Sequence, residues 1–115
     1  MTPEGRVKAK VKKALKEHYS FMPVQNGMGA PGLDFYCCVV GLFVAIETKV
    51  PGKRLTARQH ITASQIAKAG GMVFVIRDDA DIQQMMARIV FAIEYGRKGQ
   101  PGYIYDTLPP LPETT

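Results

Sequence analysis

The stretch Gly32–Lys49, GLDFYCCVVGLFVAIETK, is apolar along most of its length, but it begins with an aspartate and ends with Glu-Thr-Lys. β-Branched and aromatic residues dominate both halves, as in strands. Gly41-Leu42 in the middle suits a two-residue turn that needs glycine in its first position. We therefore predict a β-hairpin here.

The predicted turn determines which residues of the hairpin face each other. With Gly41-Leu42 as the turn, Asp34 faces Lys49, and Tyr36 faces Glu47. Because side chains alternate along a strand, Asp34, Glu47 and Lys49 then project from the same face of the sheet. Both faces are otherwise mostly apolar, which predicts a sheet covered on both sides.

A helix is predicted before the hairpin, from the N-cap Thr2 to about Tyr19. An apolar stripe recurs at helical spacing, formed by Val7, Val11, Ala14, Leu15 and His18. Lysines occupy the remaining faces. This pattern suits a solvated helix face as well as one that faces DNA, and the sequence leaves both interpretations open.

A second helix is predicted after the hairpin, because Thr56 and Gln59 have the spacing of a capping box. It should end near Gly70-Gly71. The buried-strand pattern Met72–Ile76 follows, and its connection through a helix predicts a strand in the same sheet, parallel to 44–49.

The C-terminal part consists of a third predicted helix and a tail. The helix follows Asp78 and carries an apolar stripe formed by Ile82, Met85, Met86, Ile89, Val90 and Ile93. From Gly96 onward the sequence is rich in glycine and proline, although Tyr103–Tyr105 could dock on the body. We therefore divide the chain into an α/β domain, residues 1–95, and a tail, residues 96–115.

Composition narrows the class of protein. A chain of 115 residues with a net charge of +5 is expected to form one domain, with a polyanion as a plausible partner. No apolar run is long enough to span a bilayer, and the N-terminus lacks a secretory signal pattern, so we expect an intracellular protein that does not enter membranes. Cys37 and Cys38 are neighbours in a strand pattern, which predicts reduced core residues rather than a disulfide.

The charged residues at the open end of the hairpin suggest a metal site. Asp34 and Glu47 on one face could share a Mg²⁺ ion, which prefers oxygen ligands, with Lys49 beside it as a point charge. A cross-strand ion pair between Asp34 and Lys49, with Glu47 solvated, is the alternative. Three basic residues follow directly and favour the metal site, because they place phosphate-binding charge beside it: Lys53, Arg54 and Arg58.

These motifs together resemble the VRR-NUC branch of the PD-(D/E)xK nuclease superfamily. The resemblance lies in the order of Gly32-Leu33-Asp34, then Ala45-Ile46-Glu47-Thr48-Lys49, then Leu55-Thr56-Ala57-Arg58-Gln59, and it covers roughly residues 2–93. Leu33 departs from the family pattern, which has proline before the aspartate. The resemblance implies a restriction-endonuclease-like α/β fold with a mixed central sheet flanked by helices.

The resemblance also implies the roles of individual residues. Asp34, Glu47 and the backbone carbonyl of Thr48 would bind Mg²⁺ or Mn²⁺, and Lys49 would serve catalysis. Gln59 would lie beside this site, and Glu4 resembles a first-helix acid that many members add to the metal shell. We expect DNA contacts from basic residues of the first helix and of the segment after the hairpin: Lys8, Lys12, Lys53, Arg54 and Arg58.

The implied activity is magnesium-dependent hydrolysis of DNA phosphodiester bonds. Compact stand-alone members of the family resemble Holliday junction resolvases that act in repair as homodimers, so branched or four-way DNA is the expected substrate. Phage members imply a location in the host cytoplasm. Two alternatives remain open, a non-catalytic DNA-binding protein of the same fold and a flap-directed or nonspecific nuclease.

Overall fold

The computed structural model describes residues 1–24, 29, 31–96 and 103–108. Five strands form one mixed sheet in chain order: β1 (Tyr19–Phe21), β2 (Phe35–Val39), β3 (Leu42–Thr48), β4 (Met72–Ile76) and β5 (Ile104–Tyr105). The first three strands pair antiparallel, and β3, β4 and β5 pair parallel. This confirms the predicted α/β class and the parallel pairing of 72–76 with the second hairpin strand.

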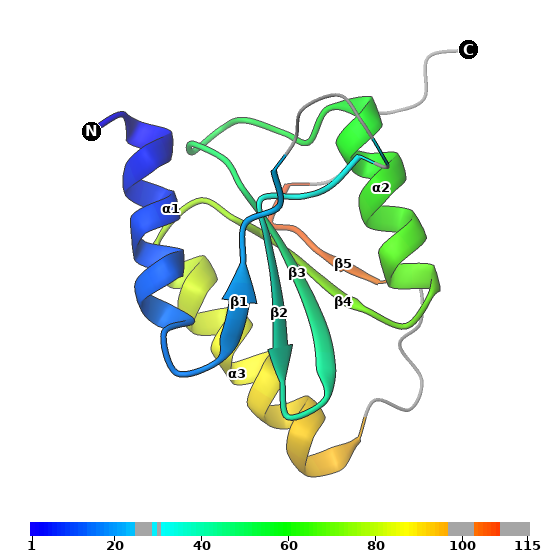
Figure 1. Ribbon diagram of the computed structural model, residues 1–115. Helices are drawn as coiled ribbons and strands as arrows, with labels where there is room; N and C mark the ends of the chain where they lie inside the picture. The colour runs from blue at the N-terminus through cyan, green and yellow to red at the C-terminus, as the bar shows by residue number, and fades with distance from the viewer. Residues whose placement is uncertain (25–28, 30, 97–102, 109–115) are drawn as a thin grey trace.

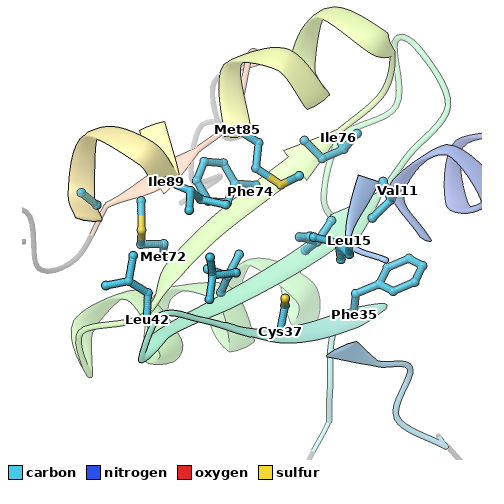
Figure 2. Packing of buried hydrophobic residues seen from close by; sticks show 14 of the residues in the cluster. Val11, Leu15, Phe35, Cys37, Leu42, Met72, Phe74, Ile76, Met85 and Ile89 are labelled. Atoms are coloured by element: carbon cyan, nitrogen blue, oxygen red, sulfur yellow. The ribbon is translucent and has the colours of Figure 1, made fainter. Parts of the chain in front are cut away.

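Three helices cover the sheet: α1 (Pro3–Ala14), α2 (Ala57–Lys68) and α3 (Asp79–Tyr95). Helices α1 and α3 lie on one face and α2 lies on the other (Figure 1). The larger core packs the first face of the sheet against Leu15, Met85 and Ile89 among others (Figure 2). The smaller core joins Ala45, Val73 and Val75 to α2. The two cores confirm a sheet covered on both sides.

Helix α1 begins as predicted, with the Thr2 side chain accepting a hydrogen bond from the Gly5 backbone N–H at 3.0 Å. The prediction that it runs to Tyr19 is wrong. It ends at Ala14, and Tyr19–Phe21 form the edge strand β1, paired with β2. The difference arises because pairing with a neighbouring strand outweighs local helical spacing in a short segment.

The hairpin forms, but its turn lies one residue earlier than predicted. Val39 pairs with Leu42, and the two turn residues Val40 and Gly41 have φ values of 49° and 79°. Both angles are positive, as in the hairpin turn whose twist matches that of the strands. This register buries Leu42, which the predicted turn would have left exposed. The error therefore reflects the burial of one large side chain.

The register shift changes the partners across the hairpin but not the faces of the paired residues. Tyr36 lies opposite Ala45 and Phe35 opposite Ile46, so the next pair places Asp34 beside Glu47 instead of Lys49. The pairing has moved by two residues, which is one full repeat of the strand, and so each side chain within the paired strands keeps its predicted face. Glu47 therefore lies on the α2 side, like Ala45. Asp34 precedes β2, and its carboxylate contacts the Thr48 hydroxyl and lies near Lys8 of α1, so its predicted place on the face of Glu47 is not kept.

Two smaller predictions of burial are also wrong. Cys37 is buried but Cys38 is exposed, and both are free thiols. On α3, Val90 and Ile93 are exposed, and Ala92 is buried in their place. Both corrections follow from partial cover, since β2 reaches beyond α2 on one face and the end of α3 extends past the sheet (Figure 1).

The C-terminal segment contributes to the sheet. Ile104–Tyr105 form β5 beside β4, and the Tyr105 ring stacks on Phe74 with ring centroids 4.8 Å apart. The expected docking of 103–105 is thus confirmed. Most of the predicted tail lies outside the described residues.

Candidate active site

The candidate site lies at the end of β3 that is remote from the hairpin turn. Asp34 precedes β2, and Glu47 and Thr48 are the last residues of β3. Because β2 and β3 run antiparallel, the start of one lies beside the end of the other. The hairpin therefore brings together residues that are 13 positions apart, and the backbone N–H of Asp34 donates to Glu47 Oε1 at 3.2 Å.

Hydrogen bonds from the strand end hold the Asp34 carboxylate. Its Oδ2 accepts from the Thr48 hydroxyl at 2.6 Å and from the Thr48 backbone N–H at 3.0 Å. Lys8 of α1 lies farther away, with Nζ 3.7 Å from Oδ1. A carboxylate oxygen can accept two hydrogen bonds or share a lone pair with a cation, so Oδ1 keeps acceptor capacity.

Glu47 is buried, with 4% of its surface exposed, and α2 supplies its second partner. The Gln59 side-chain amide donates to Glu47 Oε2 at 3.0 Å. The oxygen of the same amide accepts from the Thr56 N–H at 3.0 Å and completes a capping box with Thr56. The helix cap thus orients the Gln59 amide toward Glu47, and a functional role of Gln59 stays a prediction.

The electrostatics of the site favour a cation. Burial, and then the negative charge of Asp34, raise the pKa of Glu47 from 4.5 to about 7, against smaller opposing effects of Lys49 and Lys8. Two adjacent carboxylates that are taken out of water repel each other unless a positive charge compensates them. Their all-oxygen donor set matches the preference of Mg²⁺, which commonly binds through one or two carboxylates and substrate phosphates.

The other predicted residues differ in how exposed they are around this centre. Lys49 follows Thr48 directly, is half-buried, and lowers the pKa of Glu47 through its charge. Lys53 and Arg58 are exposed beyond the same strand end, and Arg54 is half-buried between them. Lys12 is exposed one helical turn after Lys8. These positions are compatible with DNA contacts, which stay a prediction.

Glu4 is not brought into the site. It is exposed in the first turn of α1, and the described ranges contain no cluster of three or more His, Cys, Asp or Glu side chains able to hold a metal. Asp34 and Glu47 therefore form the acidic centre by themselves in this structure. The role of Glu4 as a further ligand, like that of the Thr48 carbonyl, stays a prediction.

Two contributions escaped sequence reasoning. The Thr48 hydroxyl holds Asp34, although only the carbonyl of Thr48 had been considered. Arg77, at the end of β4, lies buried beside the site and was not singled out. A charged residue directly after the apolar run Met72–Ile76 was the available signal, since the carboxyl ends of parallel strands commonly build sites.

Comparisons with known proteins support the fold. A scan against models of protein families and a search of curated proteins both found no match. A solved structure described as a VRR_NUC domain superposes with a TM-score of 0.67 and 19% sequence identity, covering 76% of this chain and 97% of that one. None of the helices in the described part of the chain has the length and apolar character of a membrane span.

Identity this low is informative about the fold alone. The match nevertheless spans nearly the entire VRR_NUC structure, and the order of elements agrees with that expected from the sequence. The chain therefore has an α/β fold similar to that of a solved VRR_NUC domain.

Proposed function

We propose that this protein is a metal-dependent DNA endonuclease that hydrolyses phosphodiester bonds. The observation that carries the proposal is the contact of the half-buried Asp34 with the buried Glu47, whose pKa is lowered by the charge of Lys49 and whose Oε2 accepts from the Gln59 amide at 3.0 Å. The alternative, an ion pair between Asp34 and Lys49, is not favoured, because the register places Asp34 opposite Glu47. The nuclease-type fold supports the same conclusion.

The residues present fit a divalent cation. Asp34 and Glu47, with the carbonyl of Thr48, would hold Mg²⁺ or Mn²⁺. Burial and then the charge of Asp34 raise the pKa of Glu47, and such an ion would compensate the negative charge of both carboxylates. A bound divalent ion supplies Lewis-acid polarisation of the phosphate and a lower pKa for an attacking water. Thr48 and Gln59 keep the two carboxylates oriented for this purpose.

The chain's own cations complete the proposed chemistry. Lys49 directly follows Thr48 and carries a compact positive charge. This charge is suited to orient the attacking water and to neutralise charge that develops on the phosphate. Lys8, Lys12, Lys53, Arg54 and Arg58 would contact the DNA backbone. Contacts of this kind position a substrate without reading its sequence.

We further propose branched DNA, with four-way junctions first, as the substrate of a homodimer. This part rests on the resemblance of the Asp34, Glu47-Thr48-Lys49 and Thr56-Ala57-Arg58-Gln59 motifs to compact stand-alone VRR-NUC nucleases. Two sites in a dimer would act on opposing strands of one junction, as repair of such intermediates requires.

The test offers labelled four-way junction, flap, duplex and single-stranded DNA to the purified protein with Mg²⁺, Mn²⁺ or chelator. Wild type is compared with Glu47→Gln and Lys49→Met. Exposed residues of α3 and α2 supply matched controls, Glu94→Gln and Lys68→Met. We expect each site variant to lose at least about 100-fold in cleavage rate, as when a main electrostatic group is removed, while DNA binding persists.

Each result has a defined reading. Cleavage by wild type and by both controls, lost with chelator and in both site variants, supports the nuclease. DNA binding without cleavage under either metal would support the non-catalytic alternative. Duplex cleavage as fast as junction cleavage would remove the branched substrate but keep the nuclease.

A further inference from the structure

Arg77 joins three segments at the site end of the sheet. It follows β4, and 5% of its surface is exposed. Its Nε donates to the carbonyl oxygen of Lys53 at 2.9 Å, and its Nη1 donates to Asp106 Oδ1 at 2.6 Å and to Thr107 Oγ1 at 3.1 Å. One guanidinium therefore ties the segment after β3 to the segment after β5.

The segment that Arg77 holds is a tight turn. The Lys53 N–H donates to the Val50 carbonyl at 3.1 Å, and Gly52 has a φ of 87°. Proline at the second position and a left-handed glycine at the third are typical of a type II β-turn. Since the turn is rigid, fixing the Lys53 carbonyl fixes the orientation of the whole turn relative to the sheet.

This turn leads directly away from the candidate active site. Thr48 pairs with Ile76, and the Lys49 N–H donates to the Ile76 carbonyl at 3.0 Å. The residues that follow these two positions, Lys49 and Arg77, are thus neighbours at the strand ends. Val73 and Val75 belong to the core on the α2 side, so alternation places Arg77 on the face that carries Glu47.

Arg77 is poorly designed for stability alone. Its Nη2 is buried and has no hydrogen-bond partner within the described residues. A buried polar atom without a partner is unfavourable, and an apolar side chain of similar size would avoid it. What an apolar residue or a lysine lacks is a planar fork that reaches the Lys53 carbonyl and Asp106 together.

We infer that Arg77 is a positioning residue, which holds the turn 50–53 so that Lys53 and Arg54 present their charges beside the metal-binding carboxylates. The part that concerns DNA rests on the proposed function. The part that concerns the turn does not, because it depends only on the contacts of Arg77. Arg77 itself is buried and touches no substrate.

The first experiment measures the turn without DNA. Limited digestion with trypsin reports opening of the segment through cleavage after Lys53 and Arg54. We compare wild type with Arg77→Lys, and use Arg88→Lys as the matched control, because Arg88 is an arginine of α3 whose guanidinium lies 4.7 Å from the Tyr105 ring centroid and so also contacts β5. We expect about tenfold faster cleavage at 53 and 54 in Arg77→Lys only.

A second variant guards against misfolding. If Arg77→Lys does not fold, the double variant Arg77→Met/Asp106→Leu removes the buried charges together and still lacks the tie to Lys53. Faster cleavage in a folded form of either variant supports the inference. Wild-type rates of cleavage at 53 and 54 in a folded Arg77 variant would overturn it.

The second experiment measures DNA cleavage. We expect Arg77→Lys to raise KM about three- to tenfold and to keep kcat within about twofold, since a displaced phosphate contact weakens binding. A loss of kcat with unchanged KM would overturn the positioning role. If wild type cleaves no DNA, the proposed function fails, and the digestion result still decides whether Arg77 holds the turn.

Discussion

Two buried polar clusters lie at the same end of the sheet and differ in how their charges are compensated. Around Glu47, two carboxylates are adjacent, their close donors are neutral groups, and Lys8 lies 3.7 Å from Asp34. Around Arg77, a guanidinium and the Asp106 carboxylate meet at 2.6 Å. The first cluster carries an excess of negative charge, and the second is a paired arrangement.

On the proposed function, the first cluster would bind a cation, whereas the second is already an ion pair. Burial, and then the charge of Asp34, raise the pKa of Glu47, and a bound cation would favour its ionised form. A buried ion pair instead holds two segments together, and removing one partner leaves the other charge buried without compensation. Loss of the acid Glu47 should therefore leave the stability of the metal-free protein unchanged or higher, whereas loss of the acid Asp106 should lower it.

The largest expected effect on stability comes from the paired cluster. Asp106→Ala leaves the Arg77 guanidinium buried without its counter-charge. We expect a loss of about 3 kcal/mol in the free energy of unfolding. This is the lower end of the range for buried pairs, because the two-residue strand β5 beside Asp106 can move to let water reach Arg77. Urea denaturation measures it. Asp79→Ala, which breaks the exposed pair with Lys10, should cost less than about 1 kcal/mol. Equal losses in the two variants would contradict the comparison.

The cluster of Asp34 and Glu47 should respond to pH in the absence of metal. Unfolded Glu47 loses its proton near pH 4.5, whereas the folded protein keeps it until about pH 7. The folded state therefore binds more protons between these values, and its stabilisation, present in full below pH 4.5, is lost as the pH rises through 7. With chelator present, we expect Glu47 to contribute a decrease of roughly 3 kcal/mol.

Glu47→Gln isolates this contribution. The amide does not titrate, so the variant should equal or exceed wild type in stability at pH 8 and lack the Glu47 part of the pH dependence. Asp81, whose pKa is also raised by burial, is present in both proteins and cancels in the difference. Parallel curves of unfolding free energy against pH for the two proteins would refute a raised pKa of Glu47.

Addition of Mg²⁺ should stabilise the folded protein only when the carboxylates of Asp34 and Glu47 are both present. At ten times its dissociation constant, a ligand of the folded state adds about 1.4 kcal/mol, or several degrees in Tm. We expect this rise in wild type and in the exposed-acid control Glu94→Gln, and no rise in Glu47→Gln. Thermal denaturation with and without Mg²⁺ measures it. A similar rise in Glu47→Gln would place the ion elsewhere.

The smallest effect sharpens the role of the helix cap. Gln59→Ala removes one bond of the capping box and the amide that donates to Glu47, and we expect a loss of about 1 kcal/mol together with reduced cleavage. Gln65→Ala on the exposed side of α2 is the matched control and should be close to neutral. A neutral Gln59→Ala would indicate that water replaces the amide at Glu47.

Much of the fold was readable from local chemistry. Thr2 and Thr56 marked two helix starts, and the apolar pattern of Met72–Ile76 marked a buried parallel strand. Strands β1 and β5 were harder to predict as strands, because three and two residues carry too little periodicity to indicate one. Such short strands form only where a neighbouring strand offers its free edge.

The sequence by itself determined that Asp34, Glu47 and Lys49 lie at the open end of one hairpin, and strand alternation kept the face of each paired residue through a shift of two residues. Only the tertiary structure decided which of them meet. Burial of Leu42 moved the turn to Val40-Gly41 and placed Asp34 beside Glu47, and packing of α2 brought Gln59 to the same carboxylate. The contacts of Arg77 with Lys53 and Asp106 join residues distant in the chain, and spacing along a sequence contains no information about such packing.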